Sequence, residues 1–179
     1  MSSVPDSPPP PRDAPRGLAA TALHKARAFA RLPRFDRAMV LPAWLLLGAG
    51  RAAVLAVPFR HLAARMGEVG GPGDVTRQVS DAQALRARQV GRVIHLAARY
   101  APWNSNCFAQ ALAARMLLGA FGVPGVIFFG VAHEGSGATR ELVAHAWVRS
   151  GSVAVSGGAG ERYAVVASFA WPRTAGRAP

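Results

Sequence analysis

One proline-free helical stretch followed by short β-like runs sets the fold that this chain can adopt. The segment CFAQALAARMLLGAF (107–121) is rich in Ala, Leu and Met, and Gly122 and Pro124 follow it as stop signals. Four β-like runs separated by Gly-rich or polar segments come next, at 126–131, 142–148, 153–156 and 163–169. A helix followed by closely spaced strands predicts an antiparallel meander and an α+β fold.

The chain before this region is predicted to start with a disordered segment and continue as helices. Residues 1–16 hold six prolines and almost no aliphatic side chains, which predicts a disordered lead-in. Residues 17–66 are predicted to form a hydrophobic and basic helical region, in which Pro33 ends or kinks the first helix. The segment 67–75 contains EVGGPGD and is predicted to be a loop.

A single domain is predicted over 76–171. Its first helix has apolar residues at helical spacing; we expect Asp81 to cap it and the helix to end before Pro102. The remaining residues, 172–179, are expected to form a frayed tail.

The run 39–59 is the longest apolar segment and allows three interpretations. It is long enough to span a bilayer if it forms one helix. Pro42 and Pro58 oppose one continuous helix, and the charge of Arg51 is costly in hydrocarbon. An interfacial helix is the second interpretation. Helices buried against the domain or a partner are the third, and they are the default expectation.

The composition narrows the class of protein and partner. The chain has 21 Lys and Arg against 9 Asp and Glu, a net charge of +12. All of these cations except Lys25 are arginines, and they are spread over helices with little aromatic interleaving, so nucleic-acid binding is not expected. One cysteine excludes a disulfide framework and a cysteine-cage metal site. The start lacks the pattern of a signal peptide, so we expect a cytoplasmic protein, with membrane association left open.

The only thiol, Cys107, stands at a position typical of a nucleophile. It follows Asn104, Ser105 and Asn106, which are helix-capping residue types, and it opens the predicted helix. Unpaired backbone N–H groups and the positive end of the helix dipole stabilise a thiolate at such a position. The alternative is that Cys107 is a small buried apolar residue, as most free cysteines are.

His145 is the strongest candidate for a catalytic base. It lies in the centre of LVAHAWV, among apolar neighbours, so its ring nitrogens need partners. A thiol at a helix start and a histidine on a later strand match the arrangement in which a base activates a nucleophile. A structural histidine bonded to a backbone carbonyl is the alternative. His24, His61 and His95 are expected on the surface, and His133 in a loop.

A third group usually orients the base, and no aspartate follows His145 in the chain. If Ser150 and Gly151 form the hairpin turn, His145 lies directly opposite Ser156, whose hydroxyl can accept from the ring N–H. Glu161 is the nearest downstream carboxylate and is a second candidate. A backbone carbonyl or a water is the third.

Two donors are expected for the oxyanion of an acyl-transfer reaction. One is the backbone N–H of Cys107 at the helix start. The other is the indole N–H of Trp103, for which an apolar lid is the alternative role. A thiolate and an imidazole suffice for this chemistry, so we expect no metal and no cofactor.

Three segments together resemble the transglutaminase-like leader peptidases of lasso-peptide biosynthesis: PWNSNCFAQALAARMLL, GVPGVIFFGV and AHAWVRSGSVAVSGG. The resemblance covers roughly 101–170. It implies a papain- or transglutaminase-like fold in which Cys107, the nucleophile, opens a helix packed on an antiparallel sheet and His145 is the base. Where the family often shows an aspartate after the histidine, this chain has VAVSGG, which leaves the third role open.

The resemblance also implies a reaction and partners. The substrate would be the ribosomally made precursor of a lasso peptide, from which the enzyme removes the leader. Residues 1–100 lack the alternating strands of a fused recognition domain, so the chain is similar to the stand-alone peptidase half of a split B protein. A separate winged-helix-like protein would then deliver the leader, and an ATP-dependent lasso cyclase would act next.

Two alternatives of other classes stay open. The run 39–59 beside the basic stretch 17–37 suits a non-catalytic, membrane-associated assembly factor of a peptide-maturation complex. Acyl transfer to an amine would use the same thioester as hydrolysis does.

Overall fold

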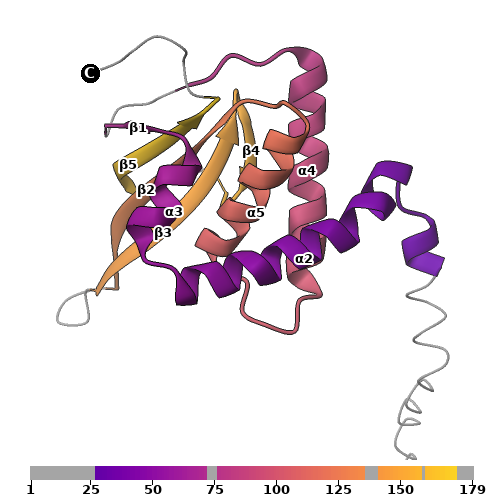
Figure 1. Cartoon of the computed structure of the whole chain (residues 1–179), viewed down its shortest axis with the longest axis horizontal. Helices are drawn as coiled ribbons and strands as arrows, with labels where there is room; N and C mark the ends of the chain where they lie inside the picture. The colour runs from indigo at the N-terminus through magenta and orange to yellow at the C-terminus, as the bar shows by residue number, and fades with distance from the viewer. Residues whose placement is uncertain (1–26, 72–75, 136–140, 159, 173–179) are drawn as a thin grey trace, which may run out of the picture. The chain divides into compact units, whose positions relative to one another are not determined.

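A computed structural model describes residues 27–71, 76–135, 141–158 and 160–172 (Figure 1). The chain divides into two compact units, Met1–Leu32 and Pro33–Pro179. In the first unit the described residues form a short helical turn at 27–30, which ends before Pro33 as predicted. The lead-in predicted over 1–16 and the tail after Pro172 lie outside the described residues.

Two helices in the second unit form the middle part of the chain. Helix α4 (Asp81–Arg99) begins at a capping box, in which the Gln83 N–H donates to Ser80 Oγ (3.3 Å) and the Ser80 N–H donates to Gln83 Oε1 (3.0 Å). The prediction that Asp81 caps this helix is therefore wrong by one residue, because Ser80 supplies the acceptor. Helix α5 (Cys107–Ala120) follows the predicted stretch and ends just before Gly122, whose φ of 63° suits glycine.

The sheet contains the four predicted strands and one more. The four are β2 (Gly125–Glu134), β3 (Glu141–Ser150), β4 (Val153–Ser156) and β5 (Ala164–Trp171). The fifth, β1 (Glu68–Gly70), lies within the segment predicted to be a loop and pairs with β5. Its three residues are too few for an alternating pattern to mark them in the sequence.

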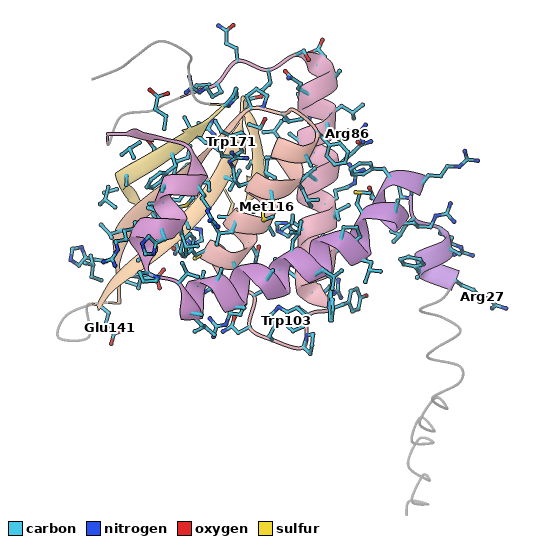
Figure 2. All side chains as sticks on the ribbon, viewed as in Figure 1. Arg27, Arg86, Trp103, Met116, Glu141 and Trp171 are labelled. Atoms are coloured by element: carbon cyan, nitrogen blue, oxygen red, sulfur yellow. The ribbon has the colours of Figure 1, made fainter. Side chains whose placement is uncertain are left out.

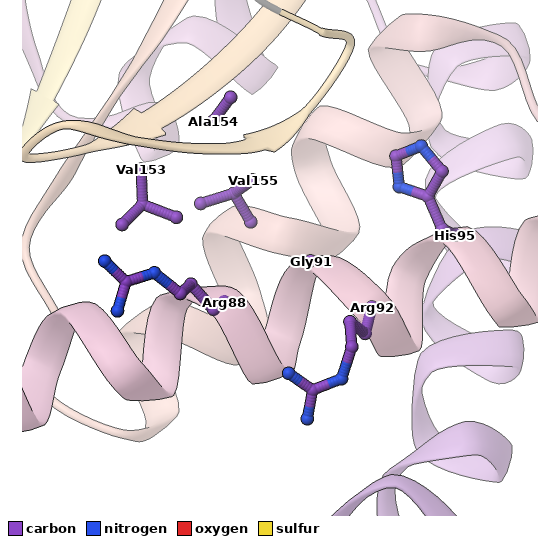
Figure 3. A pocket seen from close by; sticks show the side chains of 7 residues that line it. All are labelled: Arg88, Gly91, Arg92, His95, Val153, Ala154 and Val155. Carbon is purple, nitrogen blue, oxygen red and sulfur yellow. The ribbon is translucent and has the colours of Figure 1, made fainter.

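The strand order is β1-β5-β2-β3-β4 with antiparallel neighbours, so the predicted meander is wrong at its last step. Strand β5 pairs with β2 instead of β4. Helix α4 packs closely against β4: a Cβ atom on Gly91 would lie 2.9 Å from the carbonyl oxygen of Val155. Figure 3 shows Gly91 on α4 next to Val155 of β4; Arg88, Arg92 and His95 line the same pocket.

Alternation along the strands gives the sheet two apolar faces. One face, which we call the helix face, packs with α4 and α5 in the main core and includes Ile127, Phe129, Ala146, Val148 and Phe169. The other, which we call the outer face, carries a smaller cluster made of Val126, Phe128, Trp147 and Ala170, with Tyr163 and Val165 packed against it.

Two further helices precede the sheet in the chain. Helix α2 (Arg34–Ala56) and helix α3 (Phe59–Met66) each begin directly after a proline. Pro33–Pro179 is one compact unit, so both helices fold with the sheet. Arg115 on α5 links α3 to the core, because its Nε donates to the Met66 carbonyl (3.0 Å).

One side of α2 belongs to the core and the other is exposed. Ala43 and Leu47 are fully buried, which confirms for this side the expectation of helices buried against the domain. Asp36 is also buried, and its carboxylate accepts from Arg92 on α4. Among the described residues, α2 is the one helix long and apolar enough to cross a bilayer.

Candidate active site

The amino terminus of α5 presents the thiol of Cys107. Asn106 is the N-cap residue, as its position in the sequence predicts, and its Oδ1 accepts from the Ala109 N–H at 2.9 Å. Cys107 is the first helical residue, half-buried and free of any disulfide. The N–H groups of Cys107 and Phe108 have no acceptor within the helix, so they are available to a negatively charged group.

The loop before Cys107 holds two buried polar atoms that lack a partner among the described residues. They are the hydroxyl of Ser105 and the indole N–H of Trp103. The Trp103 ring packs on Trp44 of α2, with ring centroids 4.6 Å apart, and lies against Gly48 (Figure 2 labels it beside α2). A buried donor without an acceptor is costly, so both atoms are candidates to bind a substrate oxygen.

His145 lies on β3 and is held by different contacts. Its Nε2 donates to the carbonyl oxygen of Gly157 at 2.7 Å. Its ring stacks on Tyr163, with centroids 4.6 Å apart and an interplanar angle of 24°, and on Trp147 at 6.0 Å. The backbone carbonyl is thus the ring partner, which is one of the alternatives that the sequence left open.

The structure does not bring Cys107 and His145 together. Cys107 packs against the main core on the helix face, where Ala146 of β3 also points. His145 and Trp147 alternate with Ala146, so they point to the outer face. The expected contact between thiol and imidazole is therefore wrong for this structure, because period-two alternation directs the imidazole away from α5.

The predicted pairing of His145 with Ser156 is also wrong. Ser150 pairs with Val153, so the hairpin loop is one residue later than expected, and a bulge then places Ser156 opposite Val148. Ser156 therefore lies across from Val148 and not from His145. Its hydroxyl is buried and has no partner among the described residues.

The second candidate for the orienting group, Glu161, is near His145 without bonding to it. It lines a groove on the outer face together with the imidazole; the other lining residues are Gly157, Gly158, Gly160, Arg162 and Tyr163. Elsewhere His61 and His95 are exposed, as expected. His133 is exposed as well, but it lies on β2 and not in a loop as predicted; His24 lies outside the described residues. Among the described residues no three His, Cys, Asp or Glu side chains converge as metal ligands.

Two features of this site are not predicted from the sequence. One is the buried Ser105 hydroxyl, which has no partner among the described residues; the sequence marks Ser105 only as a capping residue type, and a serine beside the cap is the signal for a polar role. The stacking of Tyr163 on His145 had no signal in the sequence, because the two rings meet only through the β2–β3–β5 pairing.

Comparison with known proteins supplies the family. Residues 53–168 match the family described as the Transglutaminase-like superfamily, a match that contains both Cys107 and His145. No curated protein and no solved structure matches the chain. The superfamily is typically one of cysteine-dependent enzymes, peptidases or acyltransferases, and its α+β architecture is the one found in this structure. The chain belongs to the transglutaminase-like superfamily.

Proposed function

We propose that the protein is a cysteine peptidase that removes the leader from the ribosomally made precursor of a lasso peptide. The observation that carries the proposal is the single thiol at the capped start of α5, inside the region that matches the transglutaminase-like superfamily. The resemblance of the three segments around Cys107, Gly130 and His145 to lasso leader peptidases supports the choice of substrate.

The reaction proceeds through a thioester. The Cys107 thiolate attacks the carbonyl carbon between leader and core, and a carbon–sulfur bond forms. The N–H groups at the start of α5, with the indole N–H of Trp103 as a second donor, hold the oxyanion. The carbon–nitrogen bond then breaks, and the proton taken from the thiol passes to the core amine. Water hydrolyses the thioester, which yields the leader carboxylate and restores the thiol.

The base in this mechanism is His145, which has to reach the helix face. Strand β4 pairs with residues 148–150 of β3 only, so the stretch 141–147 borders no described strand on that side. A one-residue shift of this stretch along β2 turns every side chain to the opposite face. In this proposal the shift occurs when the enzyme forms a complex with the substrate and the separate recognition protein. The recognition protein supplies affinity for the leader.

The test uses the full chain with precursor and recognition protein, and mass spectrometry measures leader release. Cys107→Ala should abolish release, because no other thiol exists in the chain. His145→Phe keeps an aromatic ring against Tyr163 but has no nitrogen, so it should fold and lose activity. His133→Phe, at an exposed position on β2, is the matched control and should keep activity. Undiminished release by Cys107→Ala would end the proposal.

A second candidate function is a non-catalytic, membrane-associated assembly factor. The observation that favours it is the position of His145 on the outer face, away from Cys107. It predicts that Cys107→Ala supports peptide maturation as well as the natural chain does. Acyl transfer is distinguished by product mass, because transfer leaves the leader joined to an amine, and hydrolysis leaves a free carboxylate.

A further inference from the structure

The exposed side of α2 is apolar over most of its length. From Ala38 to the end of the helix, every residue whose side chain is classed as exposed is alanine or leucine: Ala38, Leu41, Leu45, Ala49, Ala52, Leu55 and Ala56. We call these residues the exposed α2 face. The three leucines are 63%, 57% and 69% exposed. A helix on the surface of a soluble domain normally turns charged and polar side chains to water, so this face is unusual.

The charges around this face are of one sign. Arg34 and Arg37 are exposed in the first turn of α2, Arg51 lies at its flank, and Arg60 and Arg65 are exposed on α3. Within Arg34–Met66, all of which is described, the single acidic residue is Asp36, which is buried and paired with Arg92. The surface of α2 and α3 therefore combines apolar side chains with an excess of positive charge.

We infer that the exposed α2 face binds the surface of an anionic membrane. Apolar side chains beside arginines are the composition of helices that lie in the headgroup region, where acyl chains take the leucines and acidic lipids attract the cations. The stem of Arg51 can lie along the apolar surface with its charge in the headgroups.

Two observations favour a lipid surface over a protein partner and over a membrane span. Protein interfaces carry about one hydrogen bond per 100–200 Å², and the exposed α2 face offers no hydrogen-bonding side chain from Ala38 to Ala56. A span would require lipid on all sides, yet Ala43 and Leu47 on the other side of the helix are fully buried in the domain. The helix therefore lies on the membrane.

The geometry sets the depth and orientation of binding. At 1.5 Å per residue the 23 residues of α2 extend for about 34 Å, and the helix axis lies parallel to the membrane surface. The exposed α2 face would enter the membrane surface to a depth of roughly 5–10 Å. This depth buries the leucines and leaves the sheet in water. This inference is independent of the proposed peptidase activity.

The experiment measures binding of the full-length protein to vesicles by flotation. Vesicles of phosphatidylcholine with phosphatidylglycerol are compared with vesicles of phosphatidylcholine alone, at low and high salt. We expect binding to the anionic vesicles, weakened by salt. The variant Leu41→Ser, Leu45→Ser, Leu55→Ser should bind roughly tenfold more weakly or worse.

The matched control removes three exposed apolar side chains elsewhere, in Leu85→Ser, Leu142→Ser, Val166→Ser, which are 54%, 63% and 56% exposed in the natural protein. It should bind within about twofold of the natural protein, because these positions lie outside the exposed α2 face. Circular dichroism checks that both variants are folded. Cys107→Ala should bind vesicles normally, which separates this inference from the peptidase proposal.

Three results would overturn the inference. One is equal vesicle binding by the α2 variant and the natural protein. Another is equal binding to neutral and anionic vesicles at low salt. The third is that the natural protein binds no vesicles and forms a dimer in solution, while the α2 variant stays a monomer. A second copy of the chain would then cover the exposed α2 face.

Discussion

The ion pair between Asp36 and Arg92 is predicted to hold α2 on α4. Arg92 Nε and Nη2 each lie 3.3 Å from a different carboxylate oxygen of Asp36, whose side chain is 6% exposed against 51% for Arg92. Coulomb attraction at 3.3 Å is about 5 kcal/mol at an effective dielectric constant of about 20. Because half of the guanidinium is in water, screening reduces this value toward the ~1 kcal/mol of exposed pairs.

Replacing Arg92 with alanine leaves a buried carboxylate without its cation. Loss of one partner of a fully buried pair costs about 3–5 kcal/mol, and the partial exposure of Arg92 lowers our expectation to about 2 kcal/mol of unfolding free energy. For a unit of this size the melting temperature should fall by about 4–8 °C. The double variant Asp36→Ala, Arg92→Ala removes the stranded charge, so it should lose less stability than Arg92→Ala alone.

Urea denaturation followed by circular dichroism measures these differences. Arg88→Ala is the matched control, because Arg88 lies one turn earlier on α4 and has no ion pair among the described residues. It should change the unfolding free energy by no more than about 0.5 kcal/mol. Equal stability of the Arg92→Ala and Arg88→Ala variants would show that the ion pair between Asp36 and Arg92 contributes nothing to stability.

Two further predictions concern the packing of the sheet. Gly91→Ala should lower the unfolding free energy, measured in urea, by about 1 kcal/mol. Steric overlap with Val155 costs about 1–3 kcal/mol, and the better helix propensity of alanine offsets at most about 1 kcal/mol of this. A variant more stable than the natural protein would contradict the close approach of α4 and β4. For the protein without substrate, NMR should show cross-relaxation between the ring protons of His145 and Tyr163, whose centroids are 4.6 Å apart. Cross-relaxation between His145 and the β protons of Cys107 would instead place the imidazole on the helix face.

Local patterns were enough to predict most elements of the fold. The helix that starts at Cys107, its cap at Asn106 and the four strands after it follow from capping residues, glycine and proline stops and apolar runs within a few residues of one another. The interruption at Pro33 follows from the geometry of one residue. Strand β1 escaped prediction because its partner β5 is about 100 residues away in the chain.

The pairing of strands could not be predicted, and with it the partner of His145. A register is settled by the core that the whole sheet shares, so the bulge between Val148 and Arg149 moved Ser156 out of the expected position. The face of the sheet on which His145 lies could not be predicted either. It depends on whether Ala146 or Trp147 faces α5, and the structure places Ala146 there.

The sequence by itself determined where the thiol stands, since a helix start is a local event governed by Asn106 and the residues after it. Only the tertiary structure decided what surrounds that thiol and what covers α2. Long-range packing selects one face of each strand and one side of each helix for the core, and no short stretch of sequence contains that choice.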